Sequence, residues 1–218
     1  TSYLCDRQKG EWFGLGGKGI IYISPHLPRV QALHVDVKGK LKRIAEVDAH
    51  HFLLGTTEGI YLINKEQMRT EKVVAEGGVH CMDMKTDNKG RIYISTTLGL
   101  YVYDHGNVMR YHQGNVKGFV HQPIRLALPL SDGRILVCNL LHHLGYLYPN
   151  EHRFHLLNDS LPQINAYRAL IEAIALPESN KVLITTQNGA FMLDTSCDTL
   201  CEIDSTKLYY AYSQKFNS

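Results

Sequence analysis

Short apolar runs recur along this chain in pairs, and each pair is joined by a turn that contains threonine or glycine. The clearest copy, from Asp87 to Asp104, reads DNKGRIYISTTLGLYVYD. Ile, Val, Tyr and Phe crowd its two runs, as in strands on packed, pleated surfaces. The Asp, Asn and Gly cluster ahead of the runs is typical of a tight turn. The pattern therefore predicts a β-hairpin in every copy.

The glycine between the two runs sets the period of the repeat. It occurs at Gly19, Gly59, Gly99, Gly145 and Gly189, at spacings of about 40, 40, 46 and 44 residues. Spacings of this length are typical of propeller blades. The second, third and fifth copies match closely. Glycines replace the threonines in the first copy, and the longer stretch LLHHL precedes the glycine of the fourth.

Further strands are expected on both sides of each hairpin. An apolar stretch precedes it, as at 41–47, 79–85, 126–129 and 174–177, and a more polar stretch such as 68–75 follows it. Each unit should therefore hold four strands. The leading stretches are apolar on both faces, as required of strands covered on both sides by neighbouring blades. We interpret them as inner strands around a central channel.

The sequence thus predicts an all-β protein, a single β-propeller segment of about five four-stranded blades. The expected units are 1–38, 39–77, 78–120, 121–167 and 168–206, with the start of a further strand at 207–218. Either the five blades close on themselves, or they form an arc of a larger ring. Open strand edges at both ends favour a homo-oligomer that associates through the terminal blades.

Composition narrows the possible partners. The chain has 218 residues, of which 44% are hydrophobic and 20% charged, as in ordinary soluble globular proteins. A net charge of +2 gives no strong field, so we expect neither a nucleic-acid partner nor an anionic membrane surface. No apolar run approaches the ~20 residues of a membrane span, and no signal peptide precedes Thr1. The sequence predicts a soluble chain.

Two histidine pairs, His50-His51 and His142-His143, stand out among 12 histidines. Adjacent residues on a strand point to opposite faces, so neither pair can chelate one ion from a regular strand. No His-Glu-x-x-His or Cys-x-x-Cys spacing accompanies them. We expect no metal site and no cofactor.

Five cysteines leave at least one thiol unpaired. Cys138 stands where Ser95 and Thr185 stand in other units, which predicts a small buried residue. Cys197 and Cys201 flank a turn, and the sequence leaves open whether they form a disulfide.

Glycosidase chemistry would need two carboxylates that face each other across a cleft. The inner strands offer Glu46, Asp83 and Glu172, and the nearby arginines are Arg43, Arg125 and Arg168. No spacing singles out a pair of acids, and we expect the neighbouring cations to neutralise them. The sequence therefore predicts no catalytic residue and no enzyme.

The sequence offers more candidate residues for sugar binding than for catalysis. Sugars are recognised by aromatic faces with polar groups around them. The candidate ligand-binding residues lie on the long connections into the inner strands: His121, Gln122, Arg125, Gln163, Asn165, Tyr167 and Arg168. The tyrosines at repeat positions 61, 93, 101 and 103 are expected to pack within the blades instead.

The repeat resembles that of a known family. Asp-x-x-Gly-x-Ile-Tyr-Ile-x-Thr-x-x-Gly-Leu-x-x-Tyr-Asp, as it stands from Asp87 to Asp104, is similar to the regulator-propeller repeat in the periplasmic sensors of Bacteroides-type hybrid two-component systems. The stretch NDSLP at 158–162 is similar to the connection before repeats in that family. WD40 blades lack support, because no Gly-His and Trp-Asp pairs recur. Kelch-like paired glycines occur only at 16–17 and 77–78.

The resemblance carries further expectations. Members of that family combine two seven-bladed propellers with a further β-domain, a membrane helix and a histidine kinase. It implies a fragment of a seven-bladed ring in the periplasm, on an inner-membrane protein. Its partners would be the remaining blades, the signalling domains and an oligosaccharide released from glycans. Two alternatives stay open: a protein-interaction scaffold without a small ligand, and a propeller enzyme.

Overall fold

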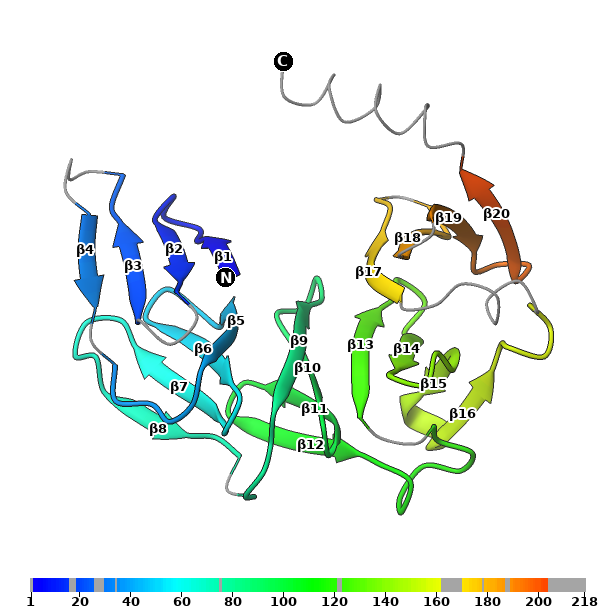
Figure 1. Cartoon of the computed structure of the whole chain (residues 1–218), viewed down its shortest axis with the longest axis horizontal. Helices are drawn as coiled ribbons and strands as arrows, with labels where there is room; N and C mark the ends of the chain where they lie inside the picture. The colour runs from blue at the N-terminus through cyan, green and yellow to red at the C-terminus, as the bar shows by residue number, and fades with distance from the viewer. Residues whose placement is uncertain are drawn as a thin grey trace.

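The computed structural model describes residues 2–15, 19–25, 30–33, 35–74, 76–120, 123–161, 170–177, 179–186 and 189–203 (Figure 1). Their secondary structure is almost entirely β and forms five antiparallel sheets of four strands each. The only helical element among these residues is a 3₁₀ turn, η1, at Pro149–Glu151. The predicted fold class, a propeller segment of five four-stranded blades, is confirmed.

The strands follow one another in chain order within each blade. Blade 1 holds β1 (Ser2–Cys5), β2 (Glu11–Gly14), β3 (Ile20–Ile23) and β4 (Val30–Leu33). Blade 2 holds β5 (Leu41–Glu46), β6 (His51–Thr56), β7 (Ile60–Asn64) and β8 (Thr70–Lys72). Blade 3 holds β9 (Cys81–Thr86), β10 (Ile92–Thr96), β11 (Gly99–Asp104) and β12 (Asn107–Tyr111). Blade 4 holds β13 (Ile124–Pro129), β14 (Ile135–Asn139), β15 (Leu144–Tyr148) and β16 (Arg153–Leu156). Blade 5 holds β17 (Leu170–Ala175), β18 (Lys181–Thr186), β19 (Gly189–Asp194) and β20 (Thr199–Ile203).

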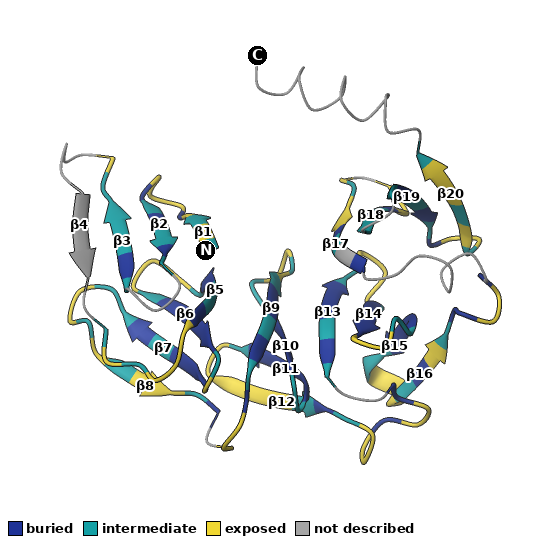
Figure 2. Ribbon diagram, viewed as in Figure 1, coloured by how far each residue is buried: buried dark blue, intermediate teal, exposed yellow. Residues whose placement is uncertain are grey.

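The five blades stand side by side along an arc (Figure 1). Their first strands, β1, β5, β9, β13 and β17, line the concave side, and the first strands of consecutive blades pack against one another. The outer strands β8, β12 and β20 are largely exposed (Figure 2). The leading stretches are therefore inner strands, as their apolar pattern predicts.

The hydrophobic core lies between the blades. Four clusters of buried side chains fill the four interfaces, and each cluster joins residues of two consecutive blades. In β6, Phe52 and Leu54 pack toward blade 1, whereas Leu53 packs toward blade 3. Because successive strand residues point to opposite faces, the second and third strands of a blade between two others are apolar at most positions. Packing on both faces explains the unbroken apolar runs of the sequence.

A threonine closes the turn between the second and third strands. The side-chain hydroxyls donate to the glycine carbonyl three residues on in the pairs Thr56–Gly59 (3.1 Å), Thr96–Gly99 (2.8 Å) and Thr186–Gly189 (3.1 Å). The Thr96 hydroxyl also accepts a hydrogen bond from the backbone N–H of Leu98 at 3.1 Å. In blade 4, Asn139 replaces the threonine and accepts from two backbone N–H groups of its longer turn. In blades 2, 3 and 5 the threonine and the glycine are thus the two ends of one hydrogen-bonded turn. The expectation for Gly145 is wrong: this residue lies within β15, opposite Val137, because the longer turn of blade 4 ends at His143.

The first strands of blades 2 to 5 share a bulge that the sequence pattern did not reveal. Pairing with the second strand skips one residue in each blade: Lys42, Met82, Arg125 and Ile171. A bulge increases the local twist and re-aims the side chains beside it. It recurs at the same place, so it belongs to the repeat.

Cys138 is buried, as its place in the repeat predicts. Burial raises the pKa of this thiol, and that of Cys81, to about 12, so both remain protonated at neutral pH. Cys197 and Cys201 are exposed free thiols in this structure.

Replacing Thr96 with alanine should lower the free energy of unfolding by about 1–2 kcal/mol, because the change removes a buried hydroxyl that makes two hydrogen bonds. Urea unfolding followed by circular dichroism measures the effect. Thr199→Ala, at an exposed position of β20, is the matched control. Equal unfolding midpoints for the two variants would contradict the role assigned to the threonine turn.

Candidate binding site at the ends of the inner strands

Charged side chains bridge the inner strands. Asp83 on β9 accepts a hydrogen bond from Nε of Arg43 on β5 at 2.8 Å. Lys85, also on β9, reaches Glu172 on β17, with 2.5 Å between Nζ and Oε1. Blades 3 and 5 are not sequence neighbours, so the second contact spans blade 4.

All three acids that the sequence singled out are ion-paired. Arg43 neutralises Asp83 as expected, whereas lysines bind the other two: Lys85 for Glu172 and Lys65 for Glu46, the latter at 3.0 Å. Arg125 pairs with no acid in the described part of the chain; its Nε donates to the backbone carbonyl of Leu170 in the next blade. The expected partner Arg168 lies outside the described residues.

Lys85 has a second acceptor within reach. Its Nζ lies 3.8 Å from Oδ2 of Asp83, a buried oxygen that has no hydrogen-bond partner among the described residues. The side chain of Asp83 is only 7% exposed, and leaving such an oxygen unpaired is costly. A movement of Lys85 away from Glu172 would satisfy it. The ammonium thus lies between two carboxylates, one on β9 and one on β17.

A cavity of about 530 Å³ opens at the carboxyl ends of β9, β13 and β17. Polar and apolar side chains share its wall, among them Lys85, Ser131, Ile174, Asn180 and Lys181. The volume lies within the range of small-molecule sites, which combine apolar surface with a few polar groups. Lys85 belongs both to this wall and to the bridge between blades 3 and 5.

Asp87 also lines the cavity, but its carboxylate is already engaged. Burial raises its pKa, and hydrogen bonds from the Arg91 side chain and from the backbone N–H groups of Arg91 and Lys89 outweigh that effect, so the pKa lies below the ordinary value. Oδ2 accepts from Nε of Arg91 at 2.8 Å and from the Tyr93 hydroxyl at 3.1 Å. Asp87 is therefore ionised at neutral pH and holds the turn.

Of the predicted ligand-binding residues, Arg125 is the one that the structure describes. It lies in the bulge of β13, near the amino end of that strand, whereas the cavity lies at the carboxyl end. His121, Gln122, Gln163, Asn165, Tyr167 and Arg168 lie outside the described residues. Sequence reasoning missed the cavity because its wall is assembled from turns of three blades more than 40 residues apart.

The histidine pairs do not converge on one point. Nδ1 of His50 lies 3.0 Å from Glu66, whereas Nδ1 of His51 lies 3.0 Å from Asp48. His142 and His143 stand in the connection between β14 and β15 rather than on a strand. Within the described part of the chain, no three His, Cys, Asp or Glu side chains are placed to hold a metal ion.

Comparison with solved structures identifies similar propellers. The chain superimposes on the extracellular domain of the hybrid two-component system BT3049 from B. thetaiotaomicron with a TM-score of 0.74 and 17% identity, over 94% of this chain and 28% of that one. A second such domain, BT4673 from the same organism, gives 0.72 and 15%, over 93% and 30%. The resemblance to hybrid two-component sensor regions is thus confirmed at the level of the fold. The chain spans less than a third of either domain.

Other propellers share the fold. YCF48 bound to a D1 peptide gives a TM-score of 0.69 at 13% identity, over 92% of this chain and 65% of that one, and a streptogramin B lyase gives 0.69 at 10%, over 93% and 67%. No family profile and no curated protein sequence matches the chain. Across the described ranges, no helix is long and apolar enough to cross a bilayer.

A double-mutant cycle tests the bridge across blade 4. Lys85→Met and Glu172→Gln should each reduce the free energy of unfolding, and the double variant should lose about 0.5–1 kcal/mol less than the sum of the two, because the ion pair is partly exposed. Urea unfolding of the four proteins gives the coupling. Strict additivity would show that the bridge does not form in solution.

Proposed function

We propose that this chain is a ligand-sensing extracytoplasmic propeller segment of a hybrid two-component signalling protein. It recognises an oligosaccharide and signals to a kinase that is not part of these 218 residues. It lies in the periplasm as part of an inner-membrane protein. Its fold likeness to the extracellular domains of two such systems supports this role. The remaining propeller blades and the signalling domains are its proposed partners.

One observation carries the proposal: Lys85 lines the 530 Å³ cavity and also ties blade 3 to blade 5. A ligand hydroxyl or carboxylate that accepts a hydrogen bond from Lys85 competes with Glu172. The unpaired oxygen of Asp83 makes the alternative position of Lys85 less costly. Ligand binding would then break the ion pair that joins blades 3 and 5. A sensor needs a contact of this kind, one that differs between the ligand-free and the ligand-bound state.

The proposed function involves no catalysis in this chain. A propeller scaffold hosts lyases as well as binding modules, and a streptogramin B lyase is among the similar structures. Here the acids on the inner strands are held by cations: Asp83 by Arg43, Glu172 by Lys85 and Glu46 by Lys65. Each of these carboxylates is thus engaged by a cation, and none of the three lines the cavity, so binding is the better-supported use of the cavity.

The alternative function is a protein-interaction scaffold without a small ligand. Tyr3 on blade 1 is 55% exposed, and strand alternation turns it away from blade 2; Ile174 on blade 5 is 51% exposed and also lines the cavity. Exposed apolar residues on sheet faces favour protein contacts. YCF48, a propeller of the same fold, binds a peptide.

Oligosaccharide sensing predicts thermal stabilisation. A panel of neutral and acidic oligosaccharides should contain a ligand that raises Tm, because ligand at 100 times Kd adds about 2.7 kcal/mol to the stability of the folded state. Lys85→Gln should abolish the rise, whereas Lys89→Gln, in the turn beside the cavity but outside its wall, should retain it. No stabilisation by any sugar would favour the scaffold.

The scaffold and the sensor both leave the terminal blade faces exposed, and we propose that the chain forms a homo-oligomer through them. Light scattering should then give a mass above one chain, and the variant Tyr3→Lys, which lies outside the cavity wall, should give the mass of one chain because a charge replaces an apolar contact. A single-chain mass for the unaltered protein would contradict this association.

A further inference from the structure

The interfaces between blades share one pattern of facing positions on the inner strands. On each inner strand, one residue points toward the preceding blade and the residue after it points toward the following blade. At three of the four interfaces these two positions meet in one hydrophobic cluster: Leu4 with Ile44, Ala45 with Met84, and Leu128 with Ala173. At the interface of blades 3 and 4, Lys85 and Ala127 occupy them. The pattern is thus a rule for how one blade packs on the next.

Blades 1 and 5 each hold one unmatched half of this pattern. Register with the second strand gives Tyr3 the position of Met84, and it gives Ile174 the position of Leu128. Met84 and Leu128 are buried, whereas Tyr3 is 55% and Ile174 51% exposed. Neither of the two exposed side chains belongs to a hydrophobic cluster of the described residues. Together they have the composition of one further contact between blades.

The neighbouring strands extend both open faces in the same way. The open face of blade 1 consists of the paired residues Tyr3, Phe13 and Ile21. The open face of blade 5 consists of the paired residues Ile174, Leu183 and Met192. In blade 3 the positions of Phe13 and Leu183 are held by Ile94 and Tyr93, which are buried against blades 2 and 4. Both open faces are therefore apolar at the positions that pack between blades.

The open face of blade 5 reaches the cavity at the carboxyl ends of the inner strands, because Ile174 lines it. Ala173 also lines it, and Ala173 holds in blade 5 the position that Tyr3 holds in blade 1. A blade 1 packed on blade 5 would therefore bring its Tyr3 to the same wall. Among the described residues this wall includes no aromatic side chain, although sugar sites commonly offer an aromatic face.

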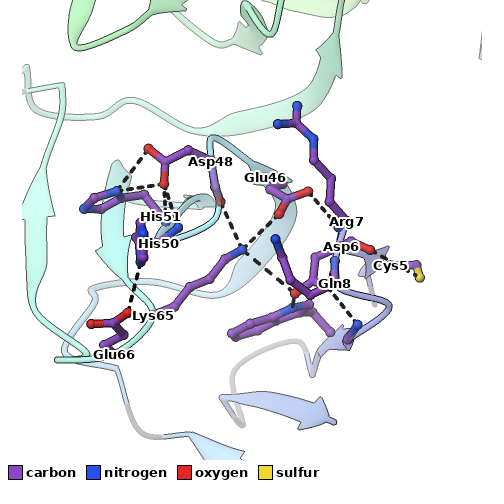
Figure 3. Close-up of polar contacts among 12 residues, drawn as sticks. Cys5, Asp6, Arg7, Gln8, Glu46, Asp48, His50, His51, Lys65 and Glu66 are labelled. Atoms are coloured by element: carbon purple, nitrogen blue, oxygen red, sulfur yellow. Dashed lines mark hydrogen bonds and ion pairs between the residues drawn. The ribbon is translucent and has the colours of Figure 1, made fainter. Parts of the chain in front are cut away.

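Blade 1 holds its open face in a fixed position. Asp6 closes the turn after β1 and accepts a hydrogen bond from Nε1 of Trp12 at 2.8 Å. The backbone N–H of Arg7, in the same turn, donates to Glu46 of blade 2 at 3.2 Å, and Glu46 also accepts from Nζ of Lys65 at 3.0 Å (Figure 3). The inner strand of blade 1 is thus anchored to blade 2. A face that is already ordered loses little entropy when a partner binds.

We propose that a second copy of this chain packs the open face of its blade 1 on the open face of blade 5, and that Tyr3 of the second copy completes the cavity wall. The contact continues the interface that joins the five blades, with the second copy in the place of a sixth blade. It is head-to-tail, because the two copies contribute different faces. The use of Tyr3 as a surface for sugar rests on the proposed function, whereas the contact between copies does not.

Two complementary variants test the head-to-tail contact. Tyr3→Lys puts a charge in the open face of blade 1, and Leu183→Lys puts one in that of blade 5. Each variant alone should have the mass of one chain by light scattering, whereas an equal mixture should have the mass of two, because each retains the face that the other lacks. Phe13→Lys and Met192→Lys form a second pair if circular dichroism shows that a member of the first is unfolded. Val108→Lys, on the exposed outer strand of blade 3, is the matched control and should associate like the unaltered chain.

Three results would overturn the contact. Association of a folded variant on its own would show that two identical faces meet. A mixture with the mass of one chain would show that the two faces do not bind each other. An unaltered chain with the mass of one chain would leave both open faces to further blades of a longer propeller.

A cysteine cross-link tests the place of Tyr3 at the cavity. Tyr3→Cys and Ile174→Cys are made separately, in a chain whose exposed cysteines 5, 197 and 201 are changed to serine. Mixed with oxidised glutathione, they should give dimers in which mass spectrometry finds positions 3 and 174 joined, since facing side chains come within disulfide distance. No linkage, or linkage only between like positions, would overturn the proposal. Neither experiment needs a sugar, so failure of the oligosaccharide panel and failure of this contact are distinguishable.

Discussion

Packing between blades is the interaction on which the rest of this structure depends. A four-stranded sheet has two faces, and each of the four hydrophobic clusters fills the space between the facing sides of two blades. Burying one large aliphatic side chain contributes about 1.5–3 kcal/mol, so each interface outweighs any single polar contact described above. Blades 2, 3 and 4 gain from two interfaces, and blades 1 and 5 from one.

The ion pairs differ from one blade to the next, whereas the apolar packing between blades is common to all five. Arg43 and Asp83 join blades 2 and 3, and Lys85 and Glu172 join blades 3 and 5. The same turn that holds an internal arginine in blade 3 holds Gly10 in blade 1, and a cavity lies beside it.

The architecture could be predicted from the sequence because it rests on local, periodic features. The threonine turn, the aligned glycines and the two-faced apolar strands each appear within about 20 residues of chain and recur. The ion pair of Lys85 with Glu172 could not be predicted, since 87 residues separate the two and a lysine rather than a neighbouring arginine makes the contact. The bulges at Lys42 and Arg125 leave no mark in the apolar pattern, because the skipped residues are polar in some blades and apolar in others.

For the candidate sites, too, local features could be predicted from the sequence, whereas contacts between distant residues could not. Expecting binding residues on connections between blades was a local inference, and Arg125, the one such residue that the structure describes, contacts the backbone of the next blade. The two cavities depend on how turns from separate blades meet.

Amide hydrogen exchange measured strand by strand tests the central claim most directly. If stability resides in the interfaces between blades, the second strands of the middle blades, β6, β10 and β14, should exchange most slowly. Those of the end blades, β2 and β18, should exchange faster, although they have hydrogen-bonded strands on both sides as well. Equal protection of β2, β10 and β18, or greatest protection in an end blade, would contradict the account.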